Sequence, residues 1–473
     1  MAENPGAEIG TPGPGFEVCN PKGPVAPEWA AAYVIDPRKD PRTAHEYTSQ
    51  PPSSADQATA NKTTETPVPE PEDGWTSGSI GTELQLRATG PQNHFVDLNP
   101  QVTLFRASYR QHTPAATETF EDAFDLMLGQ AAVVEIQRRG DVLGDVFLEI
   151  QLPNLGVAGG KWADAVGYVL LTRVRLLVDD VVVHDQERLW YDLVDRLFVP
   201  HGRRACVDAL VGRGRVLSTT KAHTVVLPLK LCCCSAAGSD RPALLPLAAL
   251  RRESRVRLEI TADSLGACLE VPAGATVPAV TKLVARVLSD QTFVGDDERR
   301  QLMHSTHDIL VTQVQDADAL SYTFDDEGVY DSATAAVDLR EINLPVKALV
   351  FVAYDETAAG RKRYFEYLDC VEDATVLFGS GQRFAPRAGA YFSAVQPYQH
   401  CTSSPPGNVH CYSFARDAAA SQPSGALNFA VAEKPVLRVS LHNTHNRPIK
   451  LKAFALCLNW VVIADGSLTM KFT

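Results

Sequence analysis

The sequence predicts an all-β protein with two consecutive eight-stranded jelly rolls, a double jelly roll, behind a long irregular N-terminal arm. Short alternating or β-branched runs separated by turn residues recur from Gly81 onward. The 473 residues are too many for one ordinary core, which favours two domains. The first 77 residues show no hydrophobic period. We therefore expect an arm (1–77), a first jelly-roll domain (78–296) and a second jelly-roll domain (297–473).

The arm is set apart by its composition. Residues 1–77 hold 13 of the 31 prolines and carry 12 acidic against 5 basic side chains, so they supply more than half of the net charge of −13. Such a segment cannot bury enough apolar surface to offset its ordering entropy alone. Two interpretations stay open: a flexible tail, or an arm that orders along neighbouring subunits through apolar anchors such as Phe16 and the run 29–35.

The first domain is predicted from alternating runs and one turn. Residues 147–153 alternate apolar and polar side chains. Residues 174–186 read as a hairpin around Asp179-Asp180, because Asp tolerates the left-handed backbone of a tight turn. The best helical period is at 191–198. Further strands are expected at 226–234, 256–263 and 282–288.

The second domain repeats this texture after a polar, charged segment at 290–300, which we interpret as the end of one domain and the start of a connection. Many short strands with turn signals between them are typical of sandwiches. The expected strands lie at 344–354, 374–380, 408–414, 435–441 and 452–464.

Composition excludes several classes of function. A net charge of −13 argues against binding nucleic acid through the whole surface, because neutralising phosphates requires basic residues. Basic clusters such as Arg203-Arg204 and Arg361–Arg363 lack interleaved aromatics. They suit solvated loops or salt bridges between subunits, or a face toward inner-shell proteins or a membrane. No apolar run is long enough for a transmembrane helix, and the N-terminus does not resemble a signal peptide.

Side chains for chemistry are sparse, so we expect no catalytic residues, no cofactor and no metal. His304 and His307, and likewise His442 and His445, are spaced three apart without an evident third ligand. Three adjacent cysteines, 232–234, are expected in a strand, where successive side chains point to opposite faces and cannot share one ion. The ten cysteines are interpreted as mostly reduced packing residues.

One stretch is more specific than the rest. Residues 99–113, NPQVTLFRASYRQHT, resemble a segment near the start of the major capsid proteins of nucleocytoplasmic large DNA viruses. The second half carries further motifs of that family in the same order, including INLPVKALVF at 342–351. The residues on which the resemblance rests most are Asn99, Pro100, Gln101, Tyr109, Arg110, Gln396, Pro397, Tyr398, Gln422, Pro423, Ser424 and Gly425.

The resemblance implies a structural protein of the virion capsid, a double jelly roll whose homotrimer forms a pseudo-hexameric capsomer of an icosahedral shell. Its implied partners are neighbouring capsomers and minor capsid and penton proteins, with no direct contact to nucleic acid. Assembly is implied in the host cytoplasm, in a viral factory, or in the nucleus.

The motif residues receive assembly roles within this interpretation. Residues 99–101 would end the N-terminal connection and open the first strand. Tyr109 and Arg110 would tie that strand to its neighbours, and residues 422–425 would form a turn between strands of the second domain.

Three alternatives remain for the function. A minor capsid or penton protein more often has a single jelly roll. A carbohydrate-binding jelly-roll module would need an exposed aromatic platform, and the five tryptophans, at 29, 75, 162, 190 and 460, do not cluster. A cupin-type metalloenzyme would need His-x-His on a strand, followed by a carboxylate.

Overall fold

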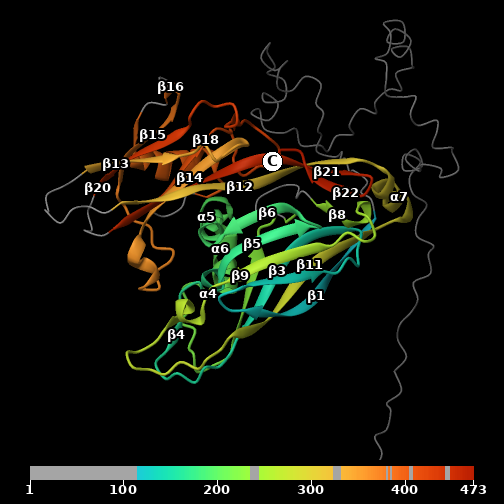
Figure 1. The fold of residues 1–473 in the computed structure, drawn as a ribbon, viewed down its shortest axis with the longest axis horizontal. Coiled ribbons are helices and arrows are strands. Elements are labelled where there is room, and N and C mark those ends of the chain that lie inside the picture. The colour runs from blue at the N-terminus through green and yellow to red at the C-terminus, as the bar shows by residue number, and fades with distance from the viewer. Residues whose placement is uncertain are drawn as a thin grey trace, which may run out of the picture. The chain divides into compact units, whose positions relative to one another are not determined.

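A computed structural model of the chain describes residues 114–234, 244–322, 332–379, 382–383, 386–403, 408–442 and 448–472. The arm, the 77/78 boundary and the motif residues Asn99, Pro100, Gln101, Tyr109 and Arg110 lie outside these ranges. The described residues form two β-sandwiches that follow one another along the chain (Figure 1).

The first sandwich has two main sheets. One has the strand order β1-β11-β3-β7 and the other β2-β9-β5-β6, and all of their pairs are antiparallel. The strands are β1 (Ala115–Met127), β2 (Ala131–Ile136), β3 (Val142–Leu152), β5 (Leu171–Val178), β6 (Val181–Glu187), β7 (His223–Leu229), β9 (Val256–Ala262) and β11 (Lys282–Val294). Three short strands complete this half. Strand β8 (Leu245–Pro246) pairs with β3, while β4 (Lys161–Trp162) and β10 (Leu269–Glu270) pair with each other.

The second sandwich repeats the same path. Its sheets have the orders β12-β21-β14-β18 and β13-β20-β15-β16. The strands are β12 (His307–Tyr322), β13 (Ser332–Asp338), β14 (Pro345–Asp355), β15 (Val371–Phe378), β16 (Gln382–Arg383), β18 (Val409–Ser413), β20 (Val436–His442) and β21 (Ile449–Ala464). The short strands β17 (Arg387–Ala388), β19 (Leu427–Asn428) and β22 (Ser467–Met470) pair with β15, β14 and β21.

Counted within each sandwich, the strands pair in the order first-eighth-third-sixth and second-seventh-fourth-fifth. Two four-stranded sheets with these long crossings form a jelly roll. The prediction of a double jelly roll with eight strands in each half is therefore confirmed.

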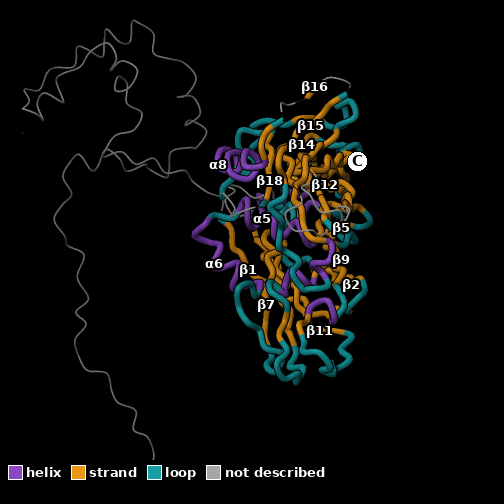
Figure 2. Tube along the Cα trace, turned by 90° about the vertical axis from the view of Figure 1, so that its left-hand side faces the viewer, coloured by secondary structure: helices purple, strands orange, loops and turns teal. Residues whose placement is uncertain are grey.

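Helices occur mainly in the connections. They are α4 (Val166–Leu170), α5 (Arg188–Phe198), α6 (His201–Val211), α7 (Asp296–His304) and α8 (Gln396–His400), which continues a π-helical turn at Tyr391–Val395. In both sandwiches a helical segment connects the fifth and sixth strands: α5 and α6 in the first, the π-turn and α8 in the second. Figure 2 shows α6 and α8 on the same side of the molecule.

Local predictions were met in part. Asp179 adopts a left-handed φ of 55° at the tip of the β5-β6 hairpin, as its sequence indicates. The strand expected over 226–234 is wrong beyond Leu229, because the Leu231 N–H bonds the Leu229 carbonyl and closes a turn. The cysteines 232–234 thus lie in a turn. Within the described ranges, no helix is both long and apolar enough to cross a bilayer.

Candidate functional site: the junction between the two sandwiches

Helix α5 packs one apolar face against the second sandwich. Its buried side chains Trp190, Leu193 and Leu197 recur at helical spacing, which places them on one side of the helix. They share a core with Val350 of β14 and Phe454 of β21. The rings of Trp190 and Phe454 lie 5.6 Å apart between centroids. This apolar contact joins the two jelly rolls.

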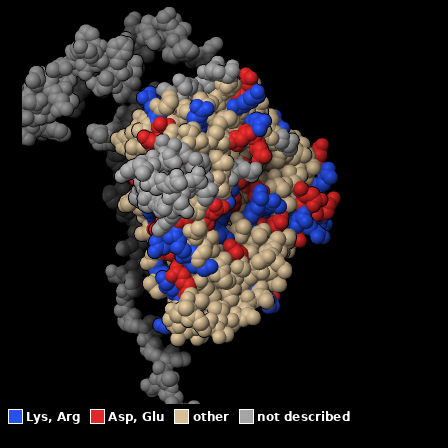
Figure 3. All heavy atoms as spheres, turned by 60° about the vertical axis from the view of Figure 1, so that its left-hand side comes forward, with Lys and Arg blue, Asp and Glu red and all other residues tan. Residues whose placement is uncertain are grey.

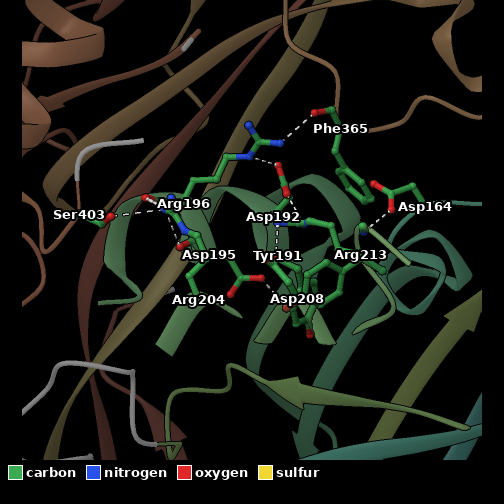
Figure 4. A network of polar contacts seen from close by, with 12 residues as sticks. Asp164, Tyr191, Asp192, Asp195, Arg196, Arg204, Asp208, Arg213, Phe365 and Ser403 are labelled. Carbon is green, nitrogen blue, oxygen red and sulfur yellow. Dashed lines mark hydrogen bonds and ion pairs between the residues drawn. The ribbon is translucent and has the colours of Figure 1, made fainter. Parts of the chain in front are cut away.

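The same helix carries two buried carboxylates, Asp192 and Asp195. Asp192 forms ion pairs with Arg213, which follows α6, and with Arg196, whose Nε lies 2.8 Å from Oδ2. The Tyr367 hydroxyl of the second sandwich donates to the same Oδ2 at 2.8 Å. A fully buried charge is stable only when it is paired and hydrogen-bonded in this way. Figure 4 shows Arg196 and Arg213 reaching Asp192.

Asp195 holds a second set of partners. Lys230, directly after β7, pairs with its Oδ1, and the Tyr168 hydroxyl of α4 donates to Oδ2 at 2.8 Å. Burial and the neighbouring carboxylate raise the pKa of Tyr168 well above its usual range, so it stays a donor. Burial lowers the pKa of Lys230, while the charge of Asp195 opposes that shift. Asp195 thereby fixes α5 to the first sandwich.

Direct hydrogen bonds complete the junction. Arg196 Nη2 donates to the Phe365 carbonyl at 3.0 Å, and the Ser403 N–H donates to the Leu197 carbonyl at 3.0 Å. Arg204 of α6 donates to the Arg196 carbonyl at 2.7 Å and reaches Ser403 Oγ at 3.4 Å. The helical connections of the two sandwiches therefore contact each other.

A further ion pair crosses between the sandwiches beside a small cavity. Lys452 of β21 pairs with Glu187 at the end of β6 and, at 2.9 Å, with Asp316 of β12. Burial raises the pKa of Glu187, and the ammonium of Lys452 opposes that shift. The adjoining cavity has a volume of about 270 Å³ and is lined by residues of both sandwiches, Arg173 and Glu341 among them.

The first predicted motif of the second half lies in and beside α8. Gln396 is buried; its Oε1 accepts from the Ser413 N–H of β18 at 2.9 Å, and its Nε2 donates to the Tyr391 hydroxyl at 3.0 Å. Pro397 is buried in the first turn of the helix. Tyr398, two residues further, is 83% exposed. Gln396 thus fixes α8 to β18 and leaves Tyr398 on the surface.

The second motif, Gln422, Pro423, Ser424 and Gly425, lies in the loop between β18 and β19. Ser424 Oγ accepts from the Asp417 N–H at 2.9 Å and donates to the Asp417 carbonyl at 3.1 Å. Gly425 has a φ of 146°.

Only glycine fits at position 425. A Cβ there would lie 2.8 Å from the Phe414 carbonyl oxygen. The loop is also held by Lys347 of β14, which is almost fully buried and donates to the Ala420 carbonyl at 2.8 Å. Burial lowers the pKa of Lys347 to about 8. Ala418 of the same loop belongs to the apolar core of the α5 junction, whereas the motif residues 422–425 are not part of that core.

Metal-ligand candidates are dispersed. Across the described ranges, no three His, Cys, Asp or Glu side chains gather as a metal site. His307 Nε2 lies 2.7 Å from the Leu302 carbonyl, so that ring has a backbone partner. Cys232 is partly buried, and desolvation raises the pKa of its thiol to about 12. His445 lies outside the described residues.

The surface in Figure 3 carries Lys and Arg interspersed with Asp and Glu, with no large area of one sign on that face.

Asp192 and Asp195 are missing from the sites that the sequence singled out. Their signal was present, because two carboxylates three apart interrupt the apolar pattern of the predicted helix 191–198. Two similar sandwiches, joined through a buried apolar and charged junction, define a protein of the double jelly-roll class.

Family models identify the chain further. Residues 103–290 match a model described as major capsid protein N-terminus, and residues 298–454 match one described as large eukaryotic DNA virus major capsid protein. Together the two models cover well over half of the chain. The chain belongs to the family of the major capsid proteins of large eukaryotic DNA viruses.

Individual relatives agree with this. The chain is 28% identical over 425 residues to the major capsid protein of Pyramimonas orientalis virus, covering 82% of this chain and 98% of that protein. The major capsid protein of Paramecium bursaria Chlorella virus 1 is 24% identical over 392 residues, covering 75% and 86%. The solved structure of VP54 of PBCV-1 superposes with a TM-score of 0.67 at 22% identity over 78% of this chain and all of that one.

Proposed function

We propose that three copies of this chain form a trimer that presents six jelly rolls as a pseudo-hexameric capsomer, and that these capsomers tile the icosahedral outer shell of a large double-stranded DNA virus. The observation that carries the proposal is that both halves of the chain follow the same strand path. The α5 junction holds these two halves together.

Symmetry explains why such a chain suits a shell. A heterologous contact that closes after three copies gives a finite building block. Since each copy contributes two similar halves, three copies present six similar sides, which is the outline needed to pair with neighbours in a hexagonal layer. Closed sandwiches also protect most of their strand edges, so loops can make the contacts.

The partners follow from this role. Neighbouring capsomers would contact the sides of the trimer, with minor capsid and penton proteins beneath it or at the vertices, and no direct contact with nucleic acid. An inner face close to a membrane fits the same role. The protein would act in the virion after assembly in the cytoplasm or nucleus of the host, without catalysis, cofactor or metal.

The motif residues would serve assembly. Gln396 and Pro397 would position α8 so that Tyr398 is available to another chain, and residues 422–425 would set the loop before β19. Residues 99–101 would end the N-terminal connection and open the first strand, and Tyr109 and Arg110 would tie that strand to its neighbours. The domain limits of 77/78 and 296/297 are proposed with this function.

The mass of the purified protein in solution tests the proposal. Light scattering at low micromolar concentration should give a stable species with about three times the 51.3 kDa of the chain. Negative-stain images of that species should show a hexagonal outline. A persistent monomer that captures glycans or a stoichiometric metal ion would instead support a carbohydrate-binding module or a cupin-type enzyme.

A further inference from the structure

We propose that Cys401 and Cys411 form a latent disulfide site that closes when the protein meets an oxidising small-molecule disulfide. The two Sγ atoms lie 3.8 Å apart. Cys401 directly follows α8, and Cys411 is the central residue of β18. Both thiols are free in this structure.

The surrounding backbone holds the two cysteines in place. The Cys401 N–H donates to the Pro397 carbonyl at 3.0 Å, which ends α8 with a hydrogen bond. The Gln396 side chain ties the start of the same helix to Ser413 of β18 at 2.9 Å. Cys411 is paired with Val350 within the sheet. A disulfide has an S–S distance of about 2.05 Å, so the two sulfurs must move ~2 Å closer, and the proposal assigns this movement to rotation of the two side chains.

Exposure determines the order of the two steps. Cys411 is completely buried, whereas Cys401 is partly exposed. The hydrogen bond to Cys401 and burial raise the pKa of the Cys411 thiol, which disfavours its direct reaction with solvent oxidants. Cys401 is therefore the first sulfur to react.

The chemistry is thiol–disulfide exchange. The Cys401 thiolate attacks one sulfur of oxidised glutathione, forms a mixed disulfide and releases one glutathione thiolate. Cys411 then loses its proton and attacks Cys401 Sγ, which releases the second glutathione. Two protein thiols are oxidised to one disulfide, and one small disulfide is reduced to two thiols, so atoms and electrons balance.

The bond would lie beside the junction between the sandwiches. Cys401 packs against the apolar junction core that includes Trp190. Two residues further, Ser403 accepts a hydrogen bond from α6 through its hydroxyl and donates one to α5 through its backbone N–H. Cross-linking residue 401 to β18 therefore fixes the segment of the second sandwich that contacts α5. If the chain forms a shell, as proposed above, the bond would stabilise particles once they leave the reducing interior of a cell.

The experiment uses the purified full-length chain and oxidised glutathione. Exposed Cys206 provides an internal measure of the reaction, which is continued until Cys206 is fully modified. Peptide mapping without reductant should then find Cys401 joined to Cys411, with the loss of two hydrogen atoms. The loop enclosed by the bond is short, so the thermal midpoint should rise by roughly 3 to 4 °C.

Variants separate the two steps. Cys411→Ser should stop at the mixed disulfide on Cys401, and Cys401→Ser should leave Cys411 unmodified; neither should gain thermal stability on oxidation. The proposal is overturned if wild-type protein shows fully modified Cys206 but free thiols, or only a glutathione adduct, at position 401. The mass in solution is measured on the same samples, so a failed disulfide in a stable trimer refutes this site and leaves the proposed assembly intact.

Discussion

Replacing Asp192 with Asn should destabilise the protein far more than the same change at Asp208. Both carboxylates pair with Arg213, so the two variants remove a charge from the same guanidinium. Asp192 is fully buried and also binds Arg196 and Tyr367, whereas the Asp208 side chain is about one third exposed and lies 3.3 Å from Arg213. The comparison therefore contrasts a buried carboxylate with several partners and a partly exposed carboxylate on the same guanidinium.

The magnitudes follow from that difference. Removing one partner of a buried ion pair costs about 3–5 kcal/mol, because the remaining charge stays desolvated. Asn keeps the volume of Asp192 and accepts one hydrogen bond, so we expect the lower end, about 3 kcal/mol. Loss of an exposed pair costs about 0–1 kcal/mol. Because the entropy of unfolding grows with chain length, 1 kcal/mol shifts the midpoint of a unit of this size by roughly 1.5 °C, so Asp192→Asn should lower the thermal midpoint by ~4–5 °C and Asp208→Asn by less than ~1.5 °C.

Urea unfolding and calorimetry of both variants, at one protein concentration and pH 7, measure these changes. The concentration must be fixed because assembly adds to apparent stability. Equal destabilisation by the two variants, or a loss below 1 kcal/mol for Asp192→Asn, would show that the buried network does not hold α5 in place.

Three further predictions concern single residues. Burial lowers the pKa of His410 to about 4. As the pH falls, the His410 imidazole therefore binds a proton in the unfolded chain before it does so in the folded chain. Stability should drop by on the order of 3 kcal/mol between pH 6.5 and 4, and urea midpoints of His410→Gln should lose that share of the pH dependence. Gly425→Ala should lower the thermal midpoint, because its Cβ would meet the Phe414 carbonyl, whereas Gly202→Ala, with open space around it, should not. Tyr398→Ala should change monomer stability by less than about 0.5 kcal/mol but reduce trimer yield on size exclusion; an unchanged yield would remove Tyr398 from the interface.

Local features of the fold could be predicted because they depend on neighbours in the chain. The β5-β6 hairpin requires a left-handed residue at its tip, and Asp179 supplies one. Helix α5 was recognised from the period of residues 191–198, although it begins at Arg188. The strand expected at 226–234 failed for the opposite reason. The apolar character of Cys232–Cys234 indicates burial, but it does not distinguish a strand from a buried turn.

The junction could not be predicted in the same way. Trp190 reads as an ordinary apolar residue on a helix, and its aromatic partner Phe454 lies in the last long strand of the chain. Asp192 and Asp195 signalled a buried polar site only weakly, since helices commonly carry acidic residues on a solvated face. Their partners come from separate elements, so the network becomes visible only when both sandwiches are placed together.

The apolar filling of the α5 junction also bears on how a curved layer could be made. A protein whose two domains were joined only by a thin connection would bend at that connection under stress. Here the packed ring of Trp190 and the ion pair of Lys452 with Glu187 oppose such bending. In a shell of these proteins, curvature would then be taken up by the angle between neighbouring molecules. Shells of different radius could be made from one protein without any change in its internal geometry.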